Sequence, residues 1–236
     1  MPFYKRKRVF TIVLGEVEMY RKFFKRLIDI VLSLLGIIIL AIPMLIIAIV
    51  VKCDSKGPAI FVQERMGRNC KPFKFYKFRS MRIDAPHDMA TREIKSDSYI
   101  TKVGAFLRKT SLDELPQMFC ILKGDMSIIG PRPVVLTETE LIEERKKTGA
   151  YAARPGLTGL AQVQMRDRLT DMKLKAEIDG KYVAKITFGQ DFKIFWKTVI
   201  KVLKEDDVVE GNSVIVKEDV NAEQETAVSD IVEAAK

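Results

Sequence analysis

Hydrophobic and polar positions divide this chain of 236 residues into an apolar segment, a mixed body and a polar end. Residues 30–51 carry no charged side chain, and about 20 apolar residues suffice to span a bilayer. Alternating or clustered apolar residues at 59–63 and 73–78 predict two short strands. Apolar spacings of three and four residues over 191–204 predict an amphipathic helix. The pattern predicts a membrane-attached α/β protein that is mostly helical, with a few short strands.

Two features of the apolar segment argue against a simple crossing of the bilayer. Basic residues flank it on both sides, whereas the positive-inside rule expects only one basic flank. Pro43 lies within the segment, where it removes a helix hydrogen bond and clashes with the preceding turn. From these residues alone, a spanning helix that tolerates Pro43 and a re-entrant helix broken at Pro43 are equally supported.

Further helices are predicted at 102–110 and at 137–148, the latter ending at Gly149. Ser111 and Glu114 have the spacing of a capping box, so we expect a helix from Ser111 to Lys123. In the helix at 191–204, lysines occupy the polar face, as in helices that lie in the membrane interface. A helix packed on the core with solvated lysines has the same pattern.

Charge and composition narrow the function classes. The chain has 40 Lys and Arg against 31 Asp and Glu, and the acids gather in residues 205–236. The basic remainder needs an anionic partner: nucleic acid, anionic lipid or a phosphorylated substrate. Three cysteines without a CxxC motif argue against a disulfide-stapled secreted domain. A single histidine, His87, argues against a His-rich zinc site or a Ser-His-Asp triad.

Candidate chemistry centres on the acidic pair Asp113 and Glu114, five residues after Arg108. A helix that starts here would offer free N–H groups to a phosphate, and with Arg108 it would favour the ionised form of Asp113. Downstream, Pro131 and Pro133 fix the backbone on either side of Arg132. Arg154 precedes a second rigid, glycine-bearing loop. Each feature alone is compatible with a structural role, but together they favour an anion-binding site.

The run RKTSLDELPQMFCILKGDMSIIGPRP, with FYKFRSM before it and RPGLTGLAQV after it, resembles the bacterial sugar transferases. These are the monotopic phosphoglycosyl transferases, of which this chain resembles the small form, and the resemblance covers roughly residues 21 to 208. Together with the charge distribution, it divides the chain into a basic N-terminal extension (1–20), a re-entrant helix-break-helix (21–52), a cytoplasmic catalytic domain (53–204) and an acidic tail (205–236). The resemblance favours the re-entrant alternative for Pro43. From the apolar stripe and the lysines beside it, we predict that the amphipathic helix lies in the membrane interface.

The resemblance further implies a reaction. Asp113 would attack the β-phosphate of a nucleoside diphosphate sugar, release UMP from a UDP-sugar, and pass the phosphosugar to polyprenol (undecaprenyl) phosphate. Glu114 would be its catalytic partner, and Mg²⁺ would bind near the pair with Asp113 as a ligand. This would initiate polysaccharide or glycan assembly. The residues that fall where the family holds phosphates are Lys77, Arg79, Arg108, Arg132 and Arg154.

The implied location is the bacterial inner membrane, with the catalytic domain on its cytoplasmic face. The implied partners are membrane lipid, the polyprenol phosphate acceptor and the nucleotide-sugar donor, without nucleic acid; a homo-oligomer stays open. One rival is a non-catalytic, membrane-anchored basic scaffold; another is a membrane-tethered nucleic-acid-binding protein. Asp179 and Tyr182 match a family pattern, but their spacing equally fits one face of a structural helix.

Overall fold

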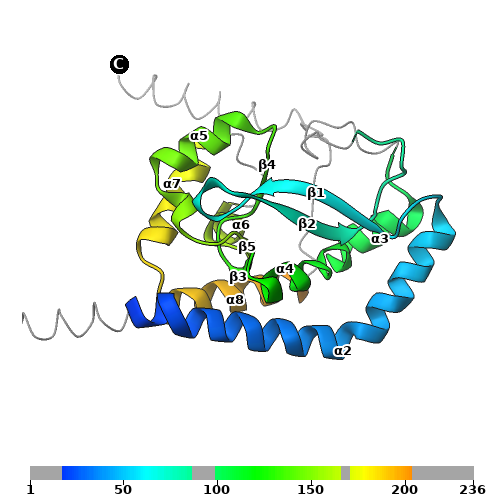
Figure 1. Cartoon of the computed structure of the whole chain (residues 1–236), viewed down its shortest axis with the longest axis horizontal. Helices are drawn as coiled ribbons and strands as arrows, with labels where there is room; N and C mark the ends of the chain where they lie inside the picture. Colours follow the sequence, from blue (N-terminus) through cyan, green and yellow to red (C-terminus); the bar gives the residue numbers. More distant parts are fainter. Residues whose placement is uncertain (1–17, 87–98, 166–170, 204–236) are drawn as a thin grey trace, which may run out of the picture.

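The computed structural model describes residues 18–86, 99–165 and 171–203, so the predicted basic extension, apart from its last residues, and the acidic tail lie outside the described residues. The mostly helical fold with a few short strands is confirmed (Figure 1). The elements are η1 Tyr20–Phe24, α2 Lys25–Asp54, β1 Ile60–Met66, η2 Arg68–Cys70, β2 Pro72–Phe78, α3 Lys102–Lys109, η5 Leu112–Glu114, α4 Gln117–Lys123, β3 Ser127–Ile129, β4 Val134–Val135, α5 Thr139–Lys147, η6 Ala150–Ala152, β5 Gly156–Thr158, α6 Leu160–Met165, α7 Met172–Ala184 and α8 Phe188–Leu203.

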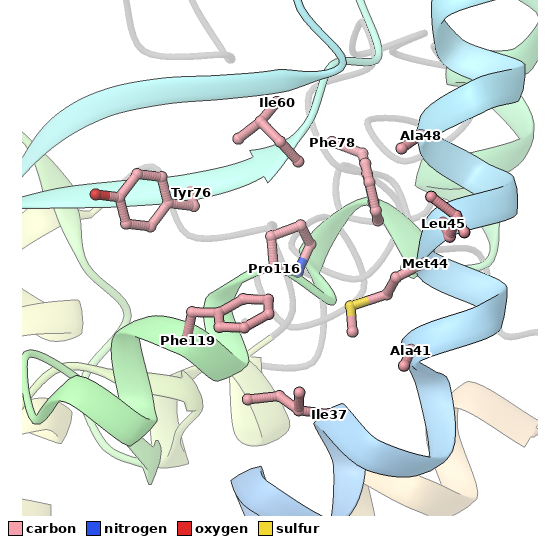
Figure 2. Close-up of a pocket in the computed structure, with 10 residues that line it drawn as sticks. All are labelled: Ile37, Ala41, Met44, Leu45, Ala48, Ile60, Tyr76, Phe78, Pro116 and Phe119. Carbon is pink, nitrogen blue, oxygen red and sulfur yellow. The ribbon is translucent and has the colours of Figure 1, made fainter.

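The apolar segment forms one continuous helix, because η1, a π-helical turn, leads directly into α2. Tyr20–Asp54 is long and apolar enough to cross a membrane. Pro43 lies inside α2 and the helix continues through it, so the expected break is a bend instead (Figure 1). The bend falls between Ile37 and Ala41 (Figure 2). This position follows from the proline ring, which displaces the carbonyl four residues before it.

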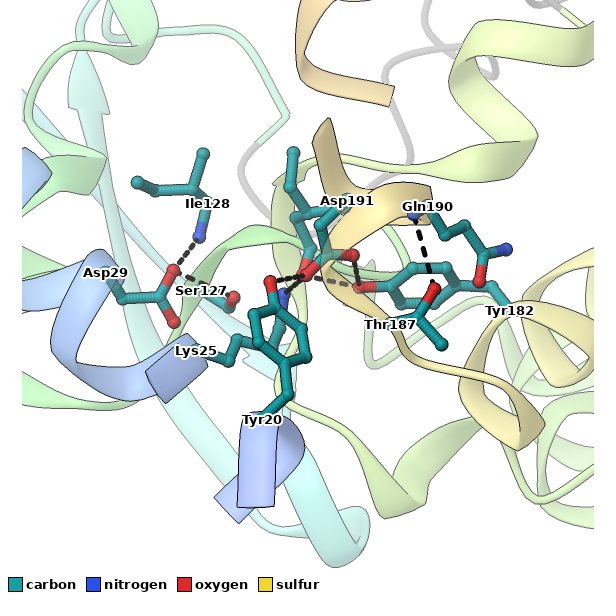
Figure 3. A network of polar contacts seen from close by, with 10 residues as sticks. Tyr20, Lys25, Asp29, Ser127, Ile128, Tyr182, Thr187, Gln190 and Asp191 are labelled. Carbon is teal, nitrogen blue, oxygen red and sulfur yellow. Dashed lines mark hydrogen bonds and ion pairs between the residues drawn. The ribbon is translucent and has the colours of Figure 1, made fainter. Parts of the chain in front are cut away.

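The N-terminal end of α2 is fixed to the body of the protein, meaning the described elements that follow α2. Lys25 forms an ion pair of 2.5 Å with Asp191 at the start of α8, and Tyr20 donates a 2.8 Å hydrogen bond to the same carboxylate (Figure 3). One turn further, Asp29 accepts bonds from the Ser127 hydroxyl and the Ile128 backbone of β3. These buried bonds fix α2 against α8 and β3.

The C-terminal end of α2 is fixed to the same body by Arg79, which follows β2. Its guanidinium donates to the carbonyl oxygens of Val51, Ser55 and Lys56. These carbonyls lie at and just beyond the last turn of α2, where backbone acceptors have no partner within the helix. Arg79 therefore caps α2, and both ends of the apolar helix are held by one body.

Two small sheets form the centre of the body. Antiparallel β1 pairs with β2 and with β4, in the order β2-β1-β4, while β3 pairs with β5 in parallel. The first two strands are those predicted at 59–63 and 73–78, extended toward their connecting turn. Asn69 and Cys70 adopt positive φ in that turn. The three strands after α4 were not predicted, because two or three residues are too few to show a period.

Two glycines bring the loop after β3 against the start of β5. A Cβ atom on Gly130 would lie 2.4 Å from the Arg154 carbonyl oxygen, and one on Gly156 would lie 2.1 Å from the Gly130 nitrogen. Only glycine permits this approach of backbone to backbone. The two loops singled out from the sequence are therefore packed directly on each other.

The predicted amphipathic helix is confirmed as α8, which begins at Phe188. One face packs into the core through Ile194, and Thr198 shares a 2.8 Å hydrogen bond with Thr158 of β5. The side chains of Phe192, Trp196 and Ile200 are about half exposed. The helix thus contacts the core with one face and leaves a largely aromatic stripe uncovered.

Candidate active site

The acidic pair lies in η5, a single 3₁₀ turn between α3 and α4. Ser111 adopts a left-handed conformation (φ 55°) and makes no capping bond through its side chain, so the predicted capping box is wrong. Ser111 instead continues the end of α3 by donating to the Arg108 carbonyl. The predicted end at Gly124 is confirmed, where φ is 104°, but α4 begins only at Gln117. Asp113 therefore does not lie at the N-terminus of an α-helix, and no helix N-terminus stabilises its charge.

Asp113 is nevertheless almost fully buried, with 1% of its surface exposed. Its Oδ2 atom has no hydrogen-bond partner, and the same holds for Nη1 of Arg108 and Nε2 of Gln117, which are also buried. A buried polar atom without a partner costs about 1–3 kcal/mol, so native structures keep few of them. Three around one turn indicate groups that are completed by a ligand.

Cations from three elements surround Asp113. Lys77 comes from β2, Arg108 from α3 and Arg132 from the loop after β3. The Arg108 side chain is oriented by a 2.8 Å bond from its Nε to the hydroxyl of Ser80. Three of the five predicted phosphate-binding residues therefore converge on the predicted nucleophile.

Burial dominates the ionisation of this cluster. Burial, and then the charge of Glu114, raise the pKa of Asp113 from 3.8 to about 6, although the three cations lower it. The expectation that its surroundings favour ionisation is wrong in direction, because burial outweighs the cations and the helix start is absent. Burial also lowers the pKa of Lys77 to about 8. Near pH 7 the aspartate is still mostly ionised and the lysine mostly protonated.

Glu114 and Arg132 are joined by an ion pair of 2.9 Å that is partly open to solvent. Two buried arginines in turn hold the backbone on which Arg132 lies. Nη1 of Arg145 donates to the Arg132 carbonyl at 2.7 Å, and Nη1 of Arg65 donates to the Pro133 carbonyl at 3.0 Å. These paired contacts fix the direction in which the Arg132 side chain leaves the loop.

The charge of Arg145 is balanced by Asp179 on α7, with Nε and Nη2 at 2.9 and 2.5 Å from Oδ2. Tyr182, one turn further, donates to Asp191 and to the Ile129 carbonyl. The alternative of a structural helix face therefore describes Asp179 and Tyr182.

Sequence reasoning missed Arg65 and Arg145. In β1, Gln63 and Arg65 occupy the buried phase of the strand alternation. Polar residues at buried positions were the available signal for Arg65. Nothing comparable marked Arg145, which lies in a helix that is polar on most sides.

The structure does not bring Arg79 and Arg154 into this cluster. Arg79 caps α2 through the carbonyls of Val51, Ser55 and Lys56, so its guanidinium is directed at the helix end and not at Asp113. Arg154 donates from Nε to the Gly124 carbonyl at 2.8 Å, and its charged neighbours are Arg26 and Asp29. Both side chains bind backbone carbonyls close to the interface between α2 and the body.

A magnesium site was expected at Asp113. Among the described residues, no group of three or more His, Cys, Asp and Glu side chains lies close enough to hold a metal. Magnesium needs no such group, since it commonly binds through one or two carboxylates together with water and substrate phosphates. The unpartnered Oδ2 of Asp113, adjacent to Glu114, fits that donor set.

Comparison with known proteins places these observations in a family. Residues 20–205 match the family described as bacterial sugar transferase. The chain is 44% identical over 186 residues to the UDP-glucose:undecaprenyl-phosphate glucose-1-phosphate transferase of Klebsiella pneumoniae, covering 75% of this chain and 40% of the relative. It is 41% identical over 201 residues to the undecaprenyl-phosphate galactose phosphotransferase of Salmonella typhimurium, covering 78% and 41%.

A shorter relative is matched over nearly its whole length. The exopolysaccharide production protein PSS of Rhizobium leguminosarum bv. phaseoli is 40% identical over 191 residues, covering 76% of this chain and 94% of the relative. The chain thus spans about two fifths of the length of the Klebsiella and Salmonella relatives and most of the Rhizobium one. The matched region contains α2, the acidic pair and α8, and the chain belongs to the bacterial sugar transferase family.

Proposed function

We propose that this protein transfers a sugar-1-phosphate from a UDP-sugar to undecaprenyl phosphate, as the first step of polysaccharide or glycan assembly. The observation that carries the proposal is the buried, unpartnered Oδ2 of Asp113 amid Lys77, Arg108 and Arg132. Such a cluster suits phosphoryl transfer, which depends on positioning and on neutralising charge. The names of the Klebsiella and Salmonella relatives support the same acceptor.

The first step forms a covalent intermediate. A carboxylate oxygen of Asp113 attacks the β-phosphorus of the donor, and the bond from that phosphorus to the oxygen bridging the α-phosphate breaks. The electron pair leaves with that oxygen on UMP. The guanidinium groups of Arg108 and Arg132 and the ammonium of Lys77 stabilise the charge on the phosphoryl oxygens. A phosphosugar ester of Asp113 remains.

The second step transfers the phosphosugar to the lipid. A phosphate oxygen of undecaprenyl phosphate attacks the same phosphorus, the bond to Asp113 breaks, and Asp113 regains its carboxylate. Glu114 holds Arg132 through its ion pair and keeps it directed at the reacting phosphate. Asp113 and Glu114 would hold magnesium, which when bound neutralises the diphosphate and makes the aspartate a usable nucleophile.

The proposal includes monotopic attachment to the cytoplasmic face. A straight helix of 30 residues would place its ends about 45 Å apart, on opposite sides of a bilayer. Instead, Lys25 and Arg79 tie the two ends to one body, which supports a helix that enters and leaves on one side. The exposed stripe of α8 would lie in the same interface. Brominated lipids should quench Trp196 if it does; an unquenched Trp196 would exclude α8 from the bilayer.

The test is a panel of UDP-sugars with undecaprenyl phosphate and magnesium, scored for UMP release and for a lipid-linked sugar diphosphate. One donor should give both products in equal amounts. Release of UDP instead of UMP, or no turnover with any donor of the panel, would contradict the proposal. Arg154→Ala is a matched control, since it removes an arginine outside the cluster and should retain most activity.

A further inference from the structure

An apolar cavity of about 490 Å³ lies between α2 and the body (Figure 2). Its volume falls within the range of ligand pockets, about 300–1,000 Å³. Ala41, Met44 and Ala48 form one wall, and Phe78 and Pro116 lie opposite. Tyr76 is the one lining residue with a polar side-chain group, and Figure 2 shows its hydroxyl pointing away. Its lining therefore provides no polar group that could bind a sugar, a nucleotide or an ion.

The bend in α2 creates this cavity. At Gly36 the helix lies so close to α4 that an added Cβ would be 2.8 Å from the sulfur of Met118. Beyond the bend, α2 returns to the body, where Val51 joins a core cluster with Phe78. Between these two contacts the helix stands away from α4. Small residues at Ala41 and Ala48, two turns apart on one face, keep the space open.

The cavity adjoins the acidic pair on one side and the exterior on the other. Pro116 follows Glu114 by two residues, and Leu112 and Leu115, on either side of the acidic pair, pack on the cluster that contains Met44 and Phe78 of the cavity wall. At the other side, Leu45 and Phe119 line the cavity while their side chains are 62% and 49% exposed. A chain could therefore extend from a phosphate at Asp113, through the cavity, to the apolar surface of α2.

We propose that this cavity binds the phosphate-proximal isoprenyl units of the lipid acceptor, an inference that rests on the proposed function. The occupant must be apolar, must be attached to the phosphate that reacts at Asp113, and must continue toward the membrane. Because lipid tails are already apolar, moving a chain from bilayer to cavity gains little from the hydrophobic effect. The cavity instead selects by shape, and it favours a branched chain over a straight alkyl chain.

The test fills the cavity and follows the two steps separately. Ala48→Phe in the full chain, reconstituted in nanodiscs, should release UMP from the donor without acceptor within twofold of the wild type. Discharge of the adduct to undecaprenyl phosphate should slow by about tenfold or more, the discrimination that one methylene group produces in an apolar pocket. The matched control is Ile42→Phe, at a position of α2 that does not line the cavity and whose side chain is 71% exposed, which should leave both steps unchanged.

Acceptor shape gives a second readout. The wild type should discharge its phosphosugar to geranylgeranyl phosphate about tenfold faster than to hexadecyl phosphate, and Ala48→Phe should reduce that preference to within about twofold. Equal use of the two acceptors by the wild type would overturn the inference, as would discharge by Ala48→Phe at the rate of Ile42→Phe.

The outcomes separate this inference from the proposed function. A wild-type protein that releases no UMP contradicts the proposed function itself. A wild type that completes both steps, with a filled cavity that leaves discharge unaltered, overturns only the inference. If Ala48→Phe fails to fold, Ala41→Phe on the same wall repeats the test. Loss of the first step in both folded variants would mark the cavity as structural and would also overturn it.

Discussion

Replacing Asp113 by Asn should stabilise the fold while abolishing activity. Asp113 is buried with Oδ2 unpartnered, and its pKa is raised from 3.8 to about 6. Folding therefore favours the protonated aspartate, and the ionised form weakens the fold at neutral pH. The contribution of the raised pKa is fully present below about pH 4 and is lost as the pH rises through about 6. Asn, which resembles the protonated acid, avoids this loss.

The size of the effect follows from the shift. About two pKa units at about 1.4 kcal/mol each correspond to about 3 kcal/mol at pH 7.5. By the same linkage, the advantage of Asp113→Asn should fall to about half at pH 5 and to well under 1 kcal/mol at pH 4. For a chain of this size, about 3 kcal/mol raises the melting temperature by roughly 6–12 °C.

Thermal unfolding followed by Trp196 fluorescence measures this, in detergent with EDTA so that no metal binds Asp113. The matched control is Asp191→Asn, the same change at a buried carboxylate that accepts from Tyr20, Lys25 and Tyr182. It leaves Lys25 without its partner and should destabilise. A melting temperature lowered by Asp113→Asn, or raised equally at pH 5 and pH 7.5, would refute the reasoning.

Three further predictions concern the rate, the loop and the topology. UMP release should fall below about pH 6, where Asp113, the proposed nucleophile, is protonated, and above about pH 8, where Lys77 loses its proton. Lys77→Arg should move only the alkaline limb of the pH profile, to higher pH. Arg145→Lys should lower kcat by about 10²-fold with little change in the KM of the donor, because it misdirects Arg132. In an Arg132→Ala background the same change should lower kcat no further, whereas equal losses in both backgrounds would indicate general destabilisation. Glu18→Cys and Lys56→Cys, each in a background without native cysteines, should be labelled from the same side of intact cells; labelling from opposite sides would establish a spanning helix.

The sequence was most informative for features that follow from residue chemistry or from regular spacing along the chain. Charge-free length predicted the apolar helix, and periodicity predicted α8, because burial of one face imposes a regular spacing. The acidic pair and Arg132 were found from residue type and from the prolines around the loop. Local chemistry was enough for these, and the resemblance assigned their roles.

The rest depended on tertiary contacts that no local pattern encodes. Arg79 and Arg154 have the same residue type as Arg108 and Arg132, but they bind backbone carbonyls at the interface with α2. The capping-box spacing at Ser111 was overridden because α3 continues into that residue. Burial of Asp113 reversed the expected direction of its pKa shift. Each correction arises from a partner distant in the sequence, or from the path of the preceding helix.

The buried carboxylate of Asp113 also marks a candidate functional position by its effect on stability. A carboxylate without a hydrogen-bond partner at Oδ2 lowers stability, and groups with strongly shifted pKa values gather at functional sites. At Asp113 the loss of stability falls on the group that we propose as the nucleophile. The buried side chains of Arg65 and Arg145, by contrast, bind the backbone around Arg132 and fix the direction of its side chain.

The most direct test of the account is mass spectrometry of the protein incubated with its UDP-sugar and magnesium but without lipid acceptor. The account predicts a phosphosugar adduct on the peptide that contains Asp113, formed together with one equivalent of UMP. It also predicts that the adduct disappears when undecaprenyl phosphate is added and never forms in Asp113→Asn. An adduct mapped to Glu114, or UMP release that requires the acceptor and leaves no adduct, would contradict it.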